Sequence, residues 1–281
     1  MVLLHGWPGD ASDYRRVVPQ LAGEYRVIVP DLRGFGASDR HPADPDRFYS
    51  ASAQAASIQA LITELGLVQP VVAGYDIGSR TAQTLARRNP ESVGALVLSP
   101  PLPGAGRRVL DPEVVPELWY QSFHRSAFGA SLIDGDRDRV RTYLRHFWEH
   151  WSGPGFVPGE ADFEALVDRY ARPGAFEASI AWYRVGDGYL RNALAERPPE
   201  RQGRIGVPVH VLWQELDPLF PRGWADRLDD FFRDAILHTV DGVGHFTPLE
   251  APEAFAELVR QAARAVRPDA GKARPSAVPP M

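Results

Sequence analysis

An aspartate between two glycines is the residue best placed for chemistry in this chain. The segment Val71–Arg80 runs from apolar residues through Gly74, Asp76 and Gly78 into a helical pattern. Paired glycines permit a sharp turn from strand to helix, and such a turn raises the central side chain above a sheet. The N-terminus of the following helix stabilises a carboxylate anion. The segment therefore predicts a nucleophile elbow that presents a carboxylate, and an aspartate that only caps the helix is the alternative.

A histidine and an acid follow later in the chain, in the order that a catalytic relay needs. His245 stands just after an apolar run that ends at Val240, and the ordinary pKa of histidine suits a general base near neutral pH. Asp217, directly before Pro218, is the favoured acid for orienting His245. Glu215 is the alternative acid, because strand ends are uncertain by a residue or two.

A glycine-rich turn, His5–Gly9, directly follows the first apolar segment. The backbone N–H groups of Trp7 in this turn and of Ile77 beside the aspartate are predicted to donate hydrogen bonds to the oxyanion that forms on an ester of Asp76. An ordinary Trp-Pro turn is the alternative interpretation of these residues.

Short apolar runs alternate with longer segments of helical periodicity, which indicates an α/β fold with a mostly parallel sheet flanked by helices. In such a sheet the turns that carry Asp76, Asp217 and His245 lie at one edge. The expected helices are Ala51–Leu65, a helix that follows Ile77, and Glu253–Val266. The expected strands are Val2–Leu4, Tyr25–Pro30, Val71–Tyr75, Ala95–Leu98, Val207–Trp213 and Ala235–Val240.

Residues 102–204 interrupt this alternation, because they are helical in pattern, rich in aromatic residues and without strand-like runs. They are predicted to form a helical cap inserted into an α/β core of residues 1–101 and 205–266. Residues 267–281 are rich in proline, alanine and glycine, and a disordered tail is predicted there.

Composition narrows the classes of function. The net charge is −5 and no basic stripe is present, so nucleic acid is not an expected partner. The chain has no cysteine, which excludes disulfides, a thiolate nucleophile and cysteine-metal sites. No apolar run approaches the roughly 18 residues of a membrane span, and no signal peptide precedes the first strand. We expect a cytoplasmic protein that acts on a small molecule without a cofactor, and a homodimer is compatible with the sequence.

Three histidines of the expected cap, His124, His146 and His150, raise the question of a metal site. His146 and His150 are spaced so that they share one helical face, but no third ligand accompanies them. No metal is therefore predicted.

Five segments together resemble the epoxide hydrolase and dehalogenase branch of the α/β-hydrolase family, and the epoxide hydrolases most. The resemblance implies an α/β-hydrolase fold in which Asp76 displaces a leaving group and forms an ester, which water activated by His245 and Asp217 then hydrolyses. Members of this family have sheet before the first of the segments, so N-terminal strands are expected to be missing here. Asp31 and Arg33 are expected to have structural roles. The segments are HGWPG (5–9), DLRGFGASD (31–39), GYDIGS (74–79), WQELDP (213–218) and GHFTPLEAPEAF (244–255).

The leaving group separates the two branches. Epoxide hydrolases usually hold the epoxide oxygen with two cap tyrosines, and Ala181–Arg184 resembles the motif of the second, which implies that Tyr183 is an acid. Alignment puts Trp119 at the position of the first tyrosine, with Tyr120 next to it. An indole N–H donates a hydrogen bond but is no proton source. The residues expected to contact the substrate are Trp119, Tyr120, Phe123 and Phe246.

Ile77 argues against a dehalogenase, because haloalkane dehalogenases typically have tryptophan after the nucleophile and fluoroacetate dehalogenases typically have arginine. Arg80 and the pairing of Trp119 with Tyr183 nevertheless resemble the fluoroacetate subfamily. We therefore expect a hydrolase that opens a bulky or aromatic epoxide to a diol, with a haloacid or haloalkane dehalogenase as the alternative. A receptor that only binds a small ligand is less favoured, because it has no need for a hydrolytic relay.

Overall fold

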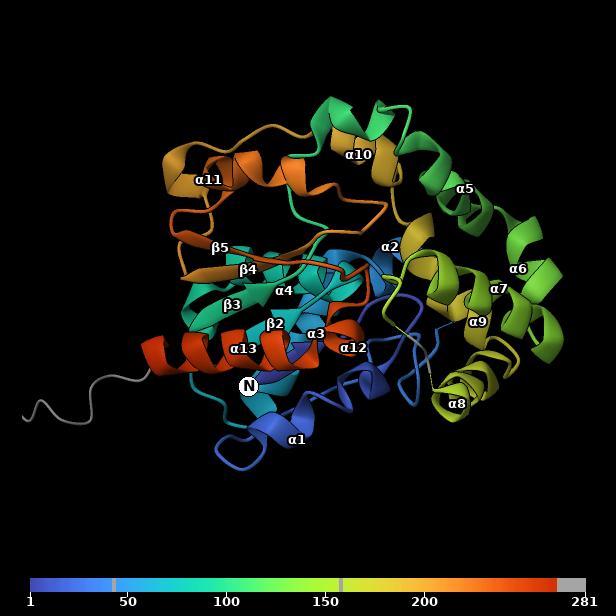
Figure 1. Ribbon diagram of the computed structural model, residues 1–281, viewed down its shortest axis with the longest axis horizontal. Helices are drawn as coiled ribbons and strands as arrows, with labels where there is room; N and C mark the ends of the chain where they lie inside the picture. The colour runs from blue at the N-terminus through green and yellow to red at the C-terminus, as the bar shows by residue number, and fades with distance from the viewer. Residues whose placement is uncertain (42–43, 157–158, 267–281) are drawn as a thin grey trace, which may run out of the picture.

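A parallel sheet of five strands forms the centre of the computed structural model, which describes residues 1–41, 44–156 and 159–266 (Figure 1). The strands lie in the order β1-β2-β3-β4-β5, and each neighbouring pair is parallel. Every residue of β1 to β4 is buried, which accounts for their largely apolar sequences. These five expected strands are confirmed to within two residues. They are β1 (Val2–Leu4), β2 (Val71–Gly74), β3 (Ala95–Leu98), β4 (Val209–Gln214) and β5 (Ala235–Val240).

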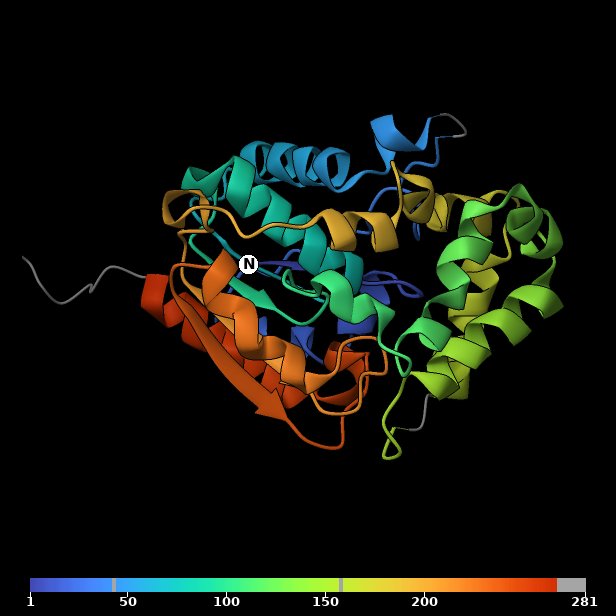
Figure 2. The ribbon, with the colours of Figure 1, turned by 90° about the horizontal axis from the view of Figure 1, so that it is seen from above.

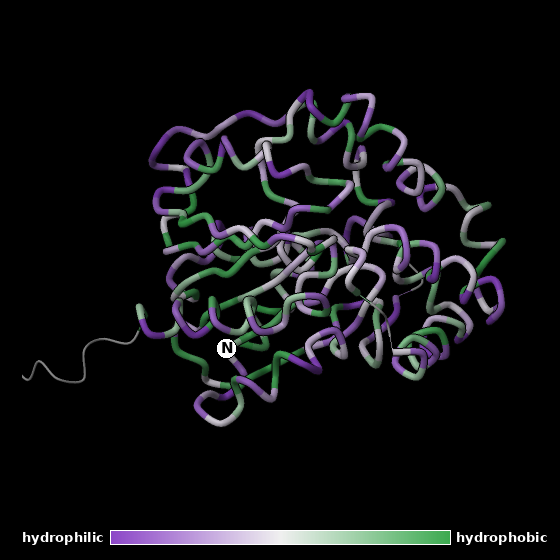
Figure 3. Tube along the Cα trace, in the orientation of Figure 1, coloured by the Kyte–Doolittle hydropathy of each residue, from purple (hydrophilic) through white to green (hydrophobic). Residues whose placement is uncertain are grey.

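Helices cover both faces of this sheet (Figure 2). On one face α4 (Asp76–Arg88) packs against β1, β2 and β3, with α3 (Ala51–Glu64) beside it. On the other face α13 (Pro252–Val266) packs against β2, β3 and β4, with α1 (Val18–Leu21) beside it. Hydrophobic residues run through the strands between these layers, and hydrophilic residues gather on the outer turns (Figure 3). Shorter helices are α2 (Pro45–Phe48), α11 (Leu228–Phe231) and α12 (Thr247–Glu250).

The helices between β3 and β4 gather beyond one end of the sheet, and we call them the cap (Figure 1). Short 3-10 helices join several of them, among them Ala181–Arg184. Because β2, β4 and β5 are parallel, the turns that follow them open toward the same end of the sheet. The cap helices are α5 (Trp119–Arg125), α6 (Ala127–Ile133), α7 (Arg137–His150), α8 (Glu160–Tyr170), α9 (Ala175–Ser179) and α10 (Tyr189–Ala195).

The expected strand Tyr25–Pro30 is wrong. Only Ile28 pairs with the sheet, in a single parallel bridge to Val2. The adjacent strand β1 is three residues long, and Pro30 has no N–H group with which to extend the ladder. The segment therefore remains irregular although its residues have the apolar character of a strand.

Two other expectations concern the ends and the surface of the chain. Residues 267–281, where a tail was predicted, lie outside the described residues. Among the residues that are described, no helix is both long enough and apolar enough to cross a membrane.

Candidate active site

The turn from β2 into α4 is a strained elbow that lifts Asp76 out of the sheet. Asp76 has a φ of 50°, in the left-handed region that costs a non-glycine residue about 1–3 kcal/mol. A Cβ atom on Gly74 would lie 2.6 Å from the carbonyl carbon of Gly78, and one on Gly78 would lie 2.1 Å from the carbonyl oxygen of Leu4. Both glycines are therefore required by close backbone contacts, as expected of this motif.

Two backbone amides hold one oxygen of the Asp76 carboxylate. The N–H of Trp7 donates to Oδ1 at 3.1 Å, and the N–H of Ile77 donates to the same oxygen at 2.5 Å. The structure thus places the two predicted oxyanion donors together. Because Oδ1 already accepts these two hydrogen bonds, Oδ2 is the carboxylate oxygen that is available to react.

Oδ2 of Asp76 lies against a buried histidine and a second acid. It is 3.2 Å from Nε2 of His245, and Nδ1 of His245 is 2.8 Å from Oδ2 of Asp217. The three residues are 6%, 0% and 4% exposed, respectively. The structure therefore brings together the nucleophile, the histidine and the acid that were named from the sequence.

Asp217, and not Glu215, is the acid beside the histidine. Its carboxylate also accepts hydrogen bonds from the side chain of Gln214 at 2.7 Å and from the N–H of Leu219 at 2.8 Å. Glu215 is exposed and accepts a hydrogen bond from the N–H of Gly242 instead. These contacts hold Asp217 in one orientation toward the imidazole.

The two carboxylates control the charge of His245. Burial lowers the pKa of the imidazole, but Asp217 and Asp76 outweigh burial and raise this pKa to about 10. At neutral pH the side chain is therefore an imidazolium that can donate to both carboxylates.

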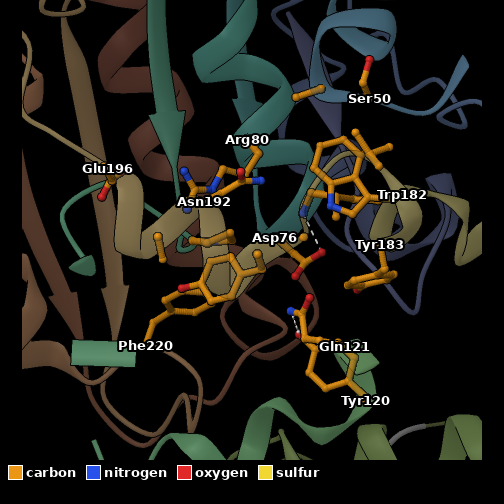
Figure 4. A pocket seen from close by; sticks show the side chains of 17 residues that line it. Ser50, Asp76, Arg80, Tyr120, Gln121, Trp182, Tyr183, Asn192, Glu196 and Phe220 are labelled. Atoms are coloured by element: carbon orange, nitrogen blue, oxygen red, sulfur yellow. Dashed lines mark hydrogen bonds between the residues drawn. The ribbon is translucent and has the colours of Figure 1, made fainter. Parts of the chain in front are cut away.

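A cavity of about 240 Å³ lies next to Asp76, between the sheet and the cap (Figure 4). Figure 4 shows Tyr120 and Tyr183 on the cap side of Asp76, with Arg80 and Asn192 across the cavity from them. The remaining walls are largely aromatic or apolar. The side chains that line it include Asp76, Ile77, Arg80, Tyr120, Gln121, Trp182, Tyr183, Tyr189, Asn192 and Phe220.

Two tyrosines face each other beside Asp76. The rings of Tyr120 and Tyr183 have centroids 5.5 Å apart and meet edge to face at 85°. Burial raises the pKa of each hydroxyl well above 10, and the charge of Asp76 adds to the increase. Both hydroxyls therefore keep their protons at neutral pH and can donate hydrogen bonds to an oxygen in the cavity.

Comparison with known proteins identifies the family. A family model described as the alpha/beta hydrolase fold matches residues 1–252. The chain belongs to the α/β-hydrolase family. This α/β hydrolase is 30% identical over 264 residues to the soluble epoxide hydrolase of Corynebacterium sp. (strain C12), which covers 90% of the chain and 86% of that protein. It is also 30% identical over 190 residues to the fluoroacetate dehalogenase of Burkholderia sp., covering 66% of the chain and 62% of that protein.

Solved structures agree with this assignment. The structure of the epoxide hydrolase CorEH superposes with a TM-score of 0.75 at 26% identity, covering 95% of the chain and 91% of that structure. The expected fold is confirmed, and the protein is a hydrolase.

Three residues expected to contact the substrate lie away from the cavity wall of this α/β hydrolase. Trp119 is 45% exposed and stacks on Phe147 at the outer side of the cap. Phe123 packs beside Trp119, and Phe246 is fully buried beside His245. Because successive helical residues point in different directions, Tyr120 enters the cavity where Trp119 cannot.

Several cavity residues were not found from the sequence. Trp182 adjoins Tyr183, and Tyr189 and Asn192 are three residues apart on α10, so they share one face of that helix. That spacing was the available signal, but only the fold shows which face of α10 meets the nucleophile. Arg80, which the sequence linked only to the fluoroacetate subfamily, also lines the cavity, and its guanidinium forms no hydrogen bond or ion pair with the described residues.

Residues for which a structural role was expected have structural contacts. Asp31 accepts hydrogen bonds from the N–H groups of Ala11 and Ala37, and Arg33 donates to the hydroxyl of Ser57.

The cap histidines considered as metal ligands have other partners. The buried His124 pairs with the Tyr143 hydroxyl at 2.9 Å, and the exposed His150 pairs with Glu117 at 2.6 Å. Within the described ranges, no three histidine, aspartate or glutamate side chains are grouped so that they could hold a metal.

Proposed function

We propose that this α/β hydrolase opens an epoxide to a vicinal diol through a covalent ester on Asp76. The observation that carries the proposal is the pair of protonated tyrosines, Tyr120 and Tyr183, facing the carboxylate. An opening epoxide releases a strongly basic alkoxide, which needs a proton donor at that place. A carboxylate nucleophile also suits displacement at saturated carbon.

In the first step, Oδ2 of Asp76 attacks an epoxide carbon and the carbon–oxygen bond breaks. The hydroxyls of Tyr120 and Tyr183 hold the leaving oxygen and give it a proton. The tyrosine regains that proton from the imidazolium of His245 through solvent. Esterification also removes the negative charge of Asp76, which lowers the pKa of His245 from about 10. The histidine is thus neutral when a base is required.

In the second step, neutral His245 takes a proton from water, and the hydroxide formed attacks the carbonyl carbon of the ester. The carbonyl oxygen, Oδ1, becomes an oxyanion on the amides of Trp7 and Ile77. Collapse of this intermediate releases the diol and regenerates the Asp76 carboxylate. The imidazolium beside Asp217 is restored at the same time, so charges and protons balance over the cycle.

The size of the cavity supports a small substrate within this class. Its volume of about 240 Å³ lies below the roughly 300–1,000 Å³ of sites for drug-sized ligands. A single aromatic ring bearing an epoxide fits this volume better than the bulky epoxide that the aromatic cap suggests.

A haloacid dehalogenase is the second candidate, and Arg80 is the observation that favours it. Its guanidinium lines the cavity, has no hydrogen-bond or ion-pair partner in the described part of the chain, and would attract a substrate carboxylate. The similarity to the fluoroacetate dehalogenase points the same way. However, the side chain of Ile77, next to Asp76, adds no donor for a carboxylate or a halide.

The two candidates are separated by offering the purified protein styrene oxide, fluoroacetate and chloroacetate side by side. Formation of phenylethanediol with no halide release is the expected result. Halide release without diol formation would reverse the ranking, and the Arg80→Gln variant should then lose that activity.

A further inference from the structure

Glu250, the last residue of α12, binds the loop that carries the catalytic histidine. Its Oε2 accepts a hydrogen bond from the N–H of Gly244 at 2.8 Å, and its Oε1 accepts one from the N–H of Phe246 at 2.9 Å. These are the two residues on either side of His245. One carboxylate therefore fixes the backbone on both sides of the imidazole.

The same carboxylate also binds the cap. Oε2 of Glu250 accepts a third hydrogen bond, from the N–H of Gly153 at 2.7 Å, just beyond the end of α7. Close by, the N–H of His245 donates to the carbonyl of Trp151 at 2.7 Å. The cap and the histidine loop are thus joined by hydrogen bonds in both directions.

The two backbones approach each other too closely for side chains. A Cβ atom on Gly153 would lie 2.2 Å from the carbonyl oxygen of Gly242, and one on Gly244 would lie 2.2 Å from the carbonyl oxygen of Trp151. The ring of Trp151 lies 5.0 Å from the imidazole of His245. A shift of either segment would therefore be transmitted to the histidine.

Glu250 must accept hydrogen bonds through both carboxylate oxygens. Burial raises the pKa of Glu250, while the three amides and the nearby His245 oppose the increase. An amide side chain at this position would turn an NH₂ group toward at least one N–H donor. Glutamine is therefore no substitute, although it has nearly the same size and shape.

We propose that Glu250 is a positioning residue for the hydrolytic half of the reaction, acting through His245. This inference rests on the proposed ester mechanism. Attack by Asp76 on the substrate does not require His245 to act as a base, whereas hydrolysis of the ester requires Nε2 to point at the attacking water. A misplacement of about 1 Å costs on the order of 100-fold in rate, so loss of Glu250 slows the second step and leaves the first.

The test is single-turnover kinetics on the full chain with styrene oxide, following ester formation by tryptophan fluorescence and ester hydrolysis by quenching and mass spectrometry. Glu250→Gln is expected to slow hydrolysis by roughly 10- to 100-fold while ester formation changes by less than about threefold. Glu253→Gln is the matched control, because Glu253 lies three residues on, its side chain is 73% exposed, and it forms a long ion pair of 3.7 Å with Arg16. It should leave both rates unchanged.

If Glu250 had a purely structural role, the variant would contain less active protein. The amplitudes of ester formation and of ester hydrolysis would then decrease together, without a selective loss in the rate of hydrolysis. That result would overturn the inference. If Glu250→Gln does not fold, Glu250→Asp, which keeps the charge but shortens the side chain, carries the same measurement. The His245→Gln variant distinguishes a failure of the role proposed for Glu250 from a failure of the ester mechanism. If it accumulates ester and the Glu250 variants do not, only the role of Glu250 fails, whereas absence of ester in His245→Gln removes the ester mechanism itself.

Discussion

The charge of His245 should make the stability of the protein fall as the pH rises from 7 to 9. Its pKa is about 10 in the folded protein, against about 6.5 in an unfolded chain. A raised pKa contributes stability that is fully present below pH 6.5 and is lost as the pH rises through about 10. Between these limits the folded state holds close to one more proton than the unfolded state, so the free energy of unfolding falls by about 1.3 kcal/mol for each pH unit, about 2.5 kcal/mol in total from pH 7 to 9.

The assay is urea unfolding at pH 7, 8 and 9, followed by tryptophan fluorescence, for the wild type and for His245→Gln. The variant lacks the titrating group, so the difference in free energy of unfolding between the two proteins should shrink by about 2.5 kcal/mol over this range. Titrating groups away from His245 are present in both proteins and cancel in the difference. A difference that does not change with pH would show that His245 is not held as an imidazolium between Asp76 and Asp217.

Two further predictions concern the cavity tyrosines and the turn that carries Asp76. Tyr120→Phe and Tyr183→Phe should each slow ester formation by about 100-fold in stopped-flow measurements, whereas Trp119→Phe, on the outer side of the cap, should change it little; a larger effect of Trp119→Phe would contradict the placement of Tyr120. Gly78→Ala should lower the free energy of unfolding by about 1–3 kcal/mol, because its Cβ would lie 2.1 Å from the Leu4 carbonyl oxygen. Gly223→Ala, with nothing within 4 Å of the added atom, is the control, and equal urea midpoints for the two variants would refute the contact.

The sheet and the grouping of Asp76, Asp217 and His245 could be predicted from the sequence because each depends on a local pattern. Asp76 is marked by glycines that close contacts require, and Asp217 and His245 each follow a strand of the same parallel sheet. Parallel strands end at one edge, so residues far apart in the chain could be placed together without knowledge of the packing.

The cap was less predictable, because the direction of its side chains depends on how short helices dock. A shift of one residue along α5 decides whether Trp119 or Tyr120 enters the cavity, and alignment alone does not settle such a shift. Phe246 follows His245 directly, yet its side chain packs into the core. The segment Tyr25–Pro30 has the composition of a strand, but strand pairing needs a neighbour of sufficient length.

A covalent ester on Asp76 can be detected by its mass when its hydrolysis is blocked. His245→Gln is mixed with styrene oxide, digested with protease, and the peptide that contains Asp76 is weighed by mass spectrometry. A mass increase equal to one molecule of substrate is expected on Asp76, with no increase in the double variant that also carries Asp76→Asn. An unmodified Asp76 peptide from a protein whose wild type converts the same epoxide to diol would show that the reaction does not pass through this ester.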